Sequence, residues 1–145
     1  NSKAWIDRIA IAEKQNQVLS GEAVVGTELA EITARRWFVN YEVGGKVTEE
    51  AKRITEMVER NSLQGFKDSV KALWEYDMKP LLSGASVRGA FLVGGGDGVL
   101  PASMKVTAAS YGKSGGEYAV IDGAGHLPMV EKPKEFTAAV EKFLG

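Results

Sequence analysis

Two short apolar runs in the second half of the sequence restrict the possible fold more than any other feature. They span Ala90–Val93 and Tyr118–Ile121, glycines lie close to both, and a helix-length segment separates them. Runs of this length, rich in aliphatic and aromatic residues and joined through a helix, are typical of a β-α-β unit with parallel strands. The sequence therefore predicts an α/β fold.

A polar residue able to take part in chemistry lies just past each run, Asp97 after the first and His126 after the second. Ligands and chemistry collect beyond the carboxyl ends of parallel strands, so both side chains are expected there. A carboxylate beside an imidazole forms the acid and base of a nucleophilic triad. We predict that His126, the one histidine of the chain, is the general base and that Asp97 orients its ring.

Both assignments have simpler alternatives. Asp97 precedes Gly98, and Asp-Gly is a common turn pair, while His126 can be a histidine without a role. Asp122 competes for the acid position because it also follows a run, but it lies only four residues before His126. We expect Asp122 to cap or brace the turn instead.

Helical periodicity fills the first half. Four helices are expected, the first from Ser2 to near Gly21, the second over Glu22–Asn40, and two more starting at Thr48 and Ser62. Pro80 ends this region, which is predicted to be wholly helical. Two later helices are expected to open at Pro101 and Pro133.

A pair of parallel strands has open edges and needs apolar cover on both faces, so it is not expected to stand alone. The sequence also opens with Asn1, without an initiator methionine or a signal-peptide pattern, which indicates a start within a longer protein. We expect an N-terminal half, in a separate chain or a missing segment, to complete the sheet.

Composition excludes several classes. Eighteen basic and 19 acidic residues give a net charge of −1, so we expect no nucleic-acid partner. The apolar runs are too short to cross a membrane. Without cysteine and with one histidine, a structural zinc site is not expected, and the absence of cysteine is compatible with a cytoplasmic protein. The glycines at 94–96 match neither a phosphate loop nor G-x-G-x-x-G, so no cofactor is expected.

The sequence resembles the last two catalytic turns of the α/β-hydrolases. The resemblance lies in the following residues: Gly94, Asp97, Pro101, Gly123-Ala124-Gly125-His126, Glu131, Pro133 and Phe136. That family orders its triad as nucleophile, acid and histidine along the chain. The resemblance implies that residues 81–145 form the C-terminal β-α-β-α part of the core, that residues 1–80 form a helical cap and return helix, and that the missing half carries the nucleophile and oxyanion hole.

A narrower similarity is to 3-oxoadipate enol-lactonases and related ester and lactone hydrolases. It rests on Trp5-x-x-Arg8, Arg36-Trp37-Phe38 and the Tyr76-Asp77 turn. The chain differs from those enzymes in a longer stretch between Arg8 and Trp37. Gly89 also stands where a proline often precedes the acid strand. The substrate therefore stays open.

The pattern G-x-S-x-G occurs at Gly112–Gly116, but a nucleophile elbow joins a strand to the following helix. Ser114 instead lies between a predicted helix and the following strand, and after the acid in the chain. We therefore do not expect Ser114 to be the nucleophile.

Six apolar residues are candidates for the walls of a substrate pocket, although the aromatic ones among them can equally be core residues. They are Trp37, Phe38, Trp74, Val99, Leu127 and Met129. The resemblance implies a small-molecule hydrolase acting on an ester, lactone or other activated carbonyl. The same acid and histidine also suit a dehalogenase, an epoxide hydrolase or a carbon–carbon hydrolase. A non-catalytic binding module and a self-sufficient small α/β protein are further alternatives.

Overall fold

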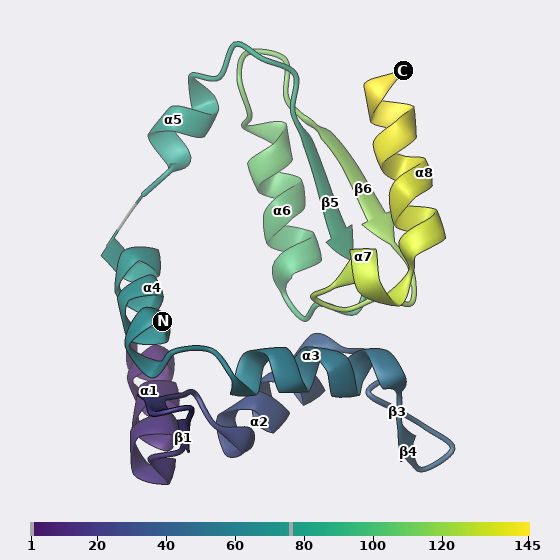
Figure 1. Cartoon of the computed structure of the whole chain (residues 1–145). Coiled ribbons are helices and arrows are strands. Elements are labelled where there is room, and N and C mark those ends of the chain that lie inside the picture. Colours follow the sequence, from purple (N-terminus) through teal and green to yellow (C-terminus); the bar gives the residue numbers. More distant parts are fainter. Residues whose placement is uncertain (1, 76) are drawn as a thin grey trace. The chain divides into compact units, whose positions relative to one another are not determined.

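The computed structural model describes residues 2–75 and 77–145, which form two compact units (Figure 1). The first unit comprises residues 1–36 and 41–76, and the second comprises residues 37–40 and 77–145. Tyr76, part of the lactonase-like motif, lies outside the described residues. The elements run in the following order: α1 (Ser2–Gln15), β1 (Val18–Leu19), β2 (Glu22–Ala23), α2 (Thr27–Trp37), β3 (Glu42–Val43), β4 (Lys46–Val47), α3 (Glu49–Glu59), α4 (Leu63–Glu75), α5 (Lys79–Ser83), β5 (Ala90–Gly94), α6 (Leu100–Ala109), β6 (Glu117–Ile121), α7 (Pro128–Glu131) and α8 (Pro133–Leu144).

The first half is not wholly helical, so that prediction is wrong. β1 pairs with β2 and β3 with β4, each as a two-residue antiparallel hairpin. Both connecting loops, Ser20-Gly21 and Gly44-Gly45, have positive φ at both residues. Two-residue loops of this kind match the twist of antiparallel strands. The first helix therefore ends at Gln15 and the second begins only at Thr27.

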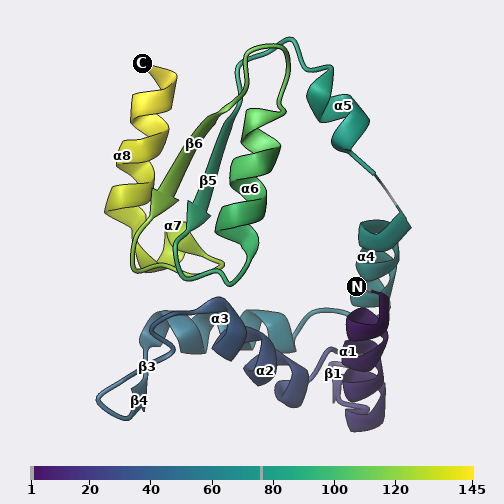
Figure 2. The ribbon, with the colours of Figure 1, turned by 180° about the vertical axis from the view of Figure 1, so that it is seen from behind.

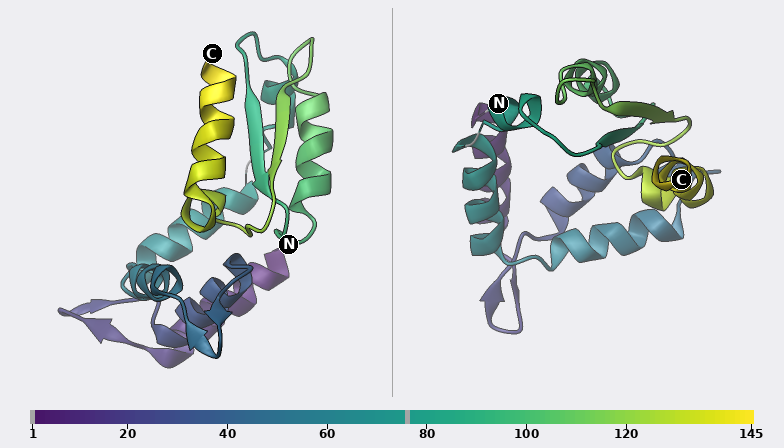
Figure 3. Two further views of the ribbon diagram at one scale, coloured as in Figure 1. Left: turned by 90° about the vertical axis from the view of Figure 1, so that its right-hand side faces the viewer. Right: turned by 90° about the horizontal axis from the view of Figure 1, so that it is seen from above.

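Helices α1 to α4 share the core of the first unit, and α1 lies beside α4 (Figures 1 and 3). This core consists of apolar residues from all four helices and from the loop before α2: Ile11, Ala12, Val25, Leu29, Val58, Leu63 and Phe66. The predicted start of α3 is confirmed, since the Thr48 hydroxyl accepts a hydrogen bond from the Ala51 amide at 3.3 Å. Such a cap stabilises a helix by about 1 kcal/mol.

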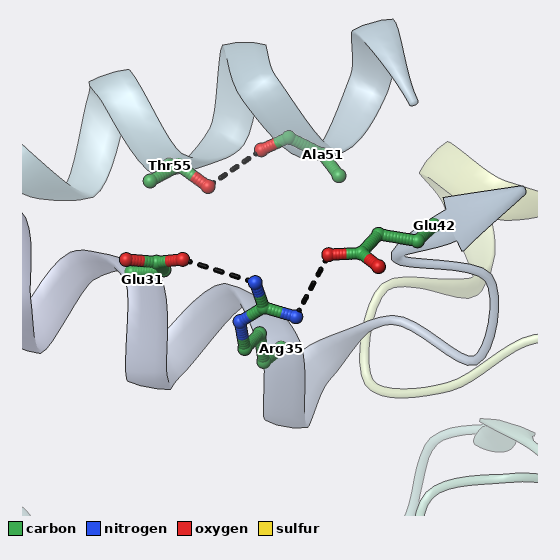
Figure 4. Close-up of polar contacts among 5 residues, drawn as sticks. All are labelled: Glu31, Arg35, Glu42, Ala51 and Thr55. Carbon is green, nitrogen blue, oxygen red and sulfur yellow. Dashed lines mark hydrogen bonds and ion pairs between the residues drawn. The ribbon is translucent and has the colours of Figure 1, made fainter. Parts of the chain in front are cut away.

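Arg35 ties the last turn of α2 to the β3 strand (Figure 4). Its guanidinium donates to Glu31 at 3.1 Å and to Glu42 at 3.0 Å, and lies over the Tyr41 ring. The hydrogen bond to Glu31, and then that to Glu42, raises the pKa of Arg35. The three charged side chains are about half exposed, whereas the Tyr41 ring is buried, so the network orders the α2–β3 connection without burying charge.

The second unit contains the predicted parallel pair, with β5 and β6 in register from Ala90 opposite Glu117 to Gly94 opposite Ile121. Helices α6 and α8 cover opposite faces of the pair (Figure 3). The prolines predicted to open helices lie in the first turns of α6 and α8. The α/β fold class is confirmed. Because the two strands are parallel and in register, their carboxyl ends lie at the same end of the sheet.

Candidate active site

The turn after β5 continues the pairing of the sheet before it bends away. The Gly95 amide donates to the Ile121 carbonyl at 2.9 Å, and the Asp97 amide donates back to the Gly94 carbonyl at 3.1 Å. The Asp97 carbonyl then accepts from the Leu100 amide at the start of α6. Asp97 is thus fixed by its backbone on both sides, between the strand and the helix.

The turn after β6 packs directly against the turn after β5. The Gly96 amide donates to the Ala124 carbonyl at 2.9 Å. A Cβ at Gly94 would collide with the carbonyl oxygens of Ala124 and Gly125. Glycine at position 94 is therefore what lets the two turns approach, and α7 lies beside them at the same end of the pair (Figure 2).

This approach brings Asp97 and His126 into contact. Asp97 Oδ2 lies 2.8 Å from His126 Nδ1. The carboxylate is 14% exposed and the imidazole is 36% exposed. When Nδ1 carries the proton and donates it to Asp97, Nε2 has a free lone pair, which is the arrangement of a general base held in one tautomer.

A segment distant in sequence completes the surroundings of His126. The carbonyl of Trp37 accepts a hydrogen bond from the His126 amide at 2.7 Å. The indole of Trp37 stacks on the imidazole, with ring centroids 5.4 Å apart and an interplanar angle of 21°. The indole Nε1 is buried without a hydrogen-bond partner among the described residues. Ring packing and the backbone bond therefore hold Trp37 here.

Glu131 connects this segment to the histidine turn. Its Oε1 accepts the amides of Val39 at 2.9 Å and Asn40 at 3.2 Å. Its Oε2 accepts the amide of Gly125 at 2.6 Å. In the sequence, Glu131 stands out only as one of the residues that carry the family resemblance, and its bridge between the Val39–Asn40 amides and the Gly125 amide was not predicted. The signal was a carboxylate five residues after the histidine, whose targets the sequence does not reveal.

The other proposed site residues lie in different surroundings. Val99, 81% exposed, follows the Asp97 turn; Leu127 is half-buried and Met129 exposed at the start of α7. Phe38 is buried in the second unit, as a core residue is. Trp74 lies on α4, in the first unit, and is 39% exposed.

The structure also shows where two competing residues lie, Asp122 for the acid and Ser114 for the nucleophile. Asp122 is exposed, whereas Asp97 makes the contact with the imidazole. Ser114 is exposed in the connection from α6 to β6, as predicted from the chain order, and so precedes a strand instead of following one. A strand-to-helix elbow therefore does not form at Ser114.

Within residues 2–75 and 77–145, no three His, Cys, Asp or Glu side chains gather closely enough to hold a metal ion. None of the helices in that part of the chain combines the length and the apolar character needed to cross a membrane.

The parallel pair with a helix on each face belongs to a mixed α/β fold that matches the C-terminal half of solved hydrolase structures. No family model and no curated protein matches the sequence. Among solved structures, the chain is similar to a malate-bound thermophilic esterase from Thermogutta terrifontis, with 24% identity and a TM-score of 0.76. It is similar also to a hydrolase from Pseudomonas aeruginosa PA01, with 24% identity and a TM-score of 0.77. Each match covers 99% of this chain and 50% of the other, so the chain spans half the length of these structures.

Proposed function

We propose that this chain supplies the acid and the histidine of a nucleophile–histidine–aspartate triad in a hydrolase that cleaves an ester, a lactone or another activated carbonyl. The observation that carries the proposal is the 2.8 Å contact between Asp97 Oδ2 and His126 Nδ1 at the carboxyl ends of β5 and β6. The fold, shared with an esterase and a hydrolase, supports it.

In the proposed reaction, the nucleophile comes from outside this chain. His126 Nε2 takes the proton of a serine hydroxyl as its oxygen attacks the substrate carbonyl, and Asp97 stabilises the imidazolium. The imidazolium gives that proton to the leaving oxygen as the tetrahedral intermediate collapses. Water, deprotonated by His126, then attacks the acyl-enzyme and forms a second tetrahedral intermediate. As this intermediate collapses, the serine oxygen leaves and takes the proton back from the imidazolium, so that an ester and water yield an acid and an alcohol. Amides of an oxyanion hole, also outside this chain, would stabilise the negatively charged oxygen of both tetrahedral intermediates.

The partner in this proposal is the N-terminal half of the same hydrolase, either as a separate chain or as a preceding segment. The parallel sheet in the described residues consists of β5 and β6 alone, and an isolated parallel pair exposes both of its edges. Exposed apolar side chains at Val87, Val106 and Val120 of the second unit give such a partner apolar surface to cover. Residues 81–145 would form the last part of the core, and residues 1–80 its cap.

The substrate in this proposal is a small molecule bound next to His126. Trp37, Leu127 and Met129 flank the imidazole in sequence or in space, and Val99 follows the Asp97 turn, so these residues would form pocket walls. No cofactor takes part in this chemistry. We propose a cytoplasmic location, with which a chain without cysteine is compatible.

Replacement of the base tests the proposal in the protein that includes the N-terminal half. We expect His126→Ala to reduce hydrolysis of p-nitrophenyl acetate by at least about 10⁴-fold while thermal unfolding stays close to wild type. Unchanged hydrolysis would refute the assignment of the base. Wild-type protein that binds but does not hydrolyse a panel of esters and lactones would favour the binding module instead.

The residue at the strand-to-helix elbow of the N-terminal half separates the remaining alternatives. Serine there fits ester, lactone or carbon–carbon bond hydrolysis. Aspartate fits a dehalogenase or an epoxide hydrolase, in which the carboxylate itself forms the covalent intermediate.

A further inference from the structure

The carboxylate of Glu131 is the point at which three separate backbone donors of the second unit converge. Two of these amides, from Val39 and Asn40, belong to the segment that carries the Trp37 indole. The third, from Gly125, belongs to the turn that carries the imidazole. One side chain therefore bridges the two backbone segments that present the stacked rings.

The packing around this bridge leaves little room for adjustment. A Cβ at Gly125 would collide with the Trp37 carbonyl and come within 3.2 Å of Glu131 Oε2. A Cβ at Gly96 would collide with the Val39 side chain. The segment 37–40 thus lies against both the histidine turn and the acid turn, and Glu131 satisfies the amides that this close approach would leave without acceptors.

An ionised carboxylate is suited to this position because both of its oxygens accept and neither donates. A glutamine keeps the length of the side chain but replaces one oxygen by an NH₂ donor. Either the Gly125 amide or the Val39 and Asn40 amides would then face a donor. An aspartate keeps both acceptors but is shorter by one methylene.

We propose that Glu131 is a positioning residue of the triad, which acts through the Trp37 segment to fix the ring of His126. This inference rests on the proposed function, since His126 is taken as the general base. Loss of the bridge would remove the acceptor of the Val39 and Asn40 amides in the Trp37 segment and of the Gly125 amide in the histidine turn together, so the indole would be held in place less firmly. The imidazole would keep its partner Asp97, but the stacked ring would limit its rotation less strictly.

The test compares Glu131→Gln with Glu135→Gln in the complete protein. Glu135 is an exposed glutamate in the first turn of α8, close in sequence, and serves as a matched control. We expect Glu131→Gln to lower kcat for p-nitrophenyl acetate by about 10- to 100-fold with KM little changed, because a misplacement of about 1 Å in a catalytic group can cost about 10²-fold. The kcat of Glu131→Asp should lie between those of Glu131→Gln and wild type, and the kcat of Glu135→Gln should match wild type.

A spectroscopic readout separates positioning from a structural role. The stacked indole should shift the imidazole proton resonances of His126 upfield, and the His126→Ala variant assigns them by their loss. We expect this upfield shift to shrink in Glu131→Gln at a temperature where circular dichroism shows the variant to be fully folded. A folded Glu131→Gln variant with the wild-type kcat and the wild-type shift would overturn the proposal.

The two proposals fail in different ways. If His126→Ala is as active as wild type, the proposed base is wrong, and the resonance shift alone then decides whether Glu131 fixes the ring. If His126→Ala is inactive but Glu131→Gln keeps both the kcat and the shift, the triad stands and the role of Glu131 falls.

Discussion

The Trp37 carbonyl accepts the amide of His126 at 2.7 Å, and the indole of the same residue stacks on the His126 ring. One residue from the end of α2 thus fixes both the backbone and the side chain of the histidine. The Asp97 carboxylate holds the ring at Nδ1. Together these contacts fix the orientation of the imidazole, as the proposed role of general base requires.

Replacement of the acid should separate Asp97 from its competitor in sequence. We expect Asp97→Asn to lower kcat by about 10⁴-fold, as in a serine-protease triad, because an amide does not enforce the tautomer with a free Nε2. Asp122→Asn, with the same chemical change at an exposed position after β6, should keep wild-type kcat. Steady-state hydrolysis of p-nitrophenyl acetate measures both, and the reverse order of effects would assign the acid to Asp122.

Addition of a methyl group at Gly94 should destabilise the site. We expect Gly94→Ala to lower the free energy of unfolding by about 1–3 kcal/mol or more, since its Cβ would collide with the carbonyls of Ala124 and Gly125. Gly65→Ala, on the surface of α4 where the Cβ meets only the Ser62 side chain at 3.5 Å or more, should instead stabilise by about 0.5–1 kcal/mol. Urea titrations of the protein that includes the N-terminal half, followed by circular dichroism, give both values, and equal stability of the two variants would contradict the close approach.

The core of the first unit should be sensitive at Leu29. This side chain is 1% exposed among Ala12 and Val25, so Leu29→Ala is expected to cost about 2–5 kcal/mol of unfolding free energy. Leu73→Ala removes the same atoms from a side chain that is 50% exposed and should cost about 1 kcal/mol. Thermal or urea unfolding of the protein that includes the N-terminal half distinguishes the two, and similar losses would show that Leu29 is not a core residue.

Expression of these 145 residues alone should yield protein that aggregates or remains partly unfolded. The reason is the pair β5 and β6, which exposes both edges without further strands. Co-expression with the N-terminal half should give a complex that sediments as one species, with both components identified by intact mass. A stable monomer of this chain alone, with cooperative unfolding, would instead support a self-sufficient α/β protein.

The local elements with strong sequence signals were predicted well. The apolar runs at Ala90–Val93 and Tyr118–Ile121 gave the parallel strands, and the cap at Thr48 gave the start of α3. The hairpins of the first half were mistaken for helix because strands of two residues are too short to show an alternating pattern. Their signals were only the loop residues Ser20-Gly21 and Gly44-Gly45.

For the site, the sequence alone determined which residues can do chemistry and where in the chain they lie. Asp97 and His126 each follow an apolar run, and parallel pairing of those runs brings both residues to the same end of the sheet. This holds because the carboxyl ends of adjacent parallel strands coincide.

The tertiary structure alone decided what surrounds the histidine. Trp37 lies far from His126 in sequence, and Glu131 reaches amides 92 and 91 residues away at Val39 and Asn40. Such contacts depend on how the chain folds back on itself, and backbone amides carry no residue identity that a pattern can reveal. The sequence therefore supplied Asp97 and His126, and folding supplied the segment that surrounds the histidine.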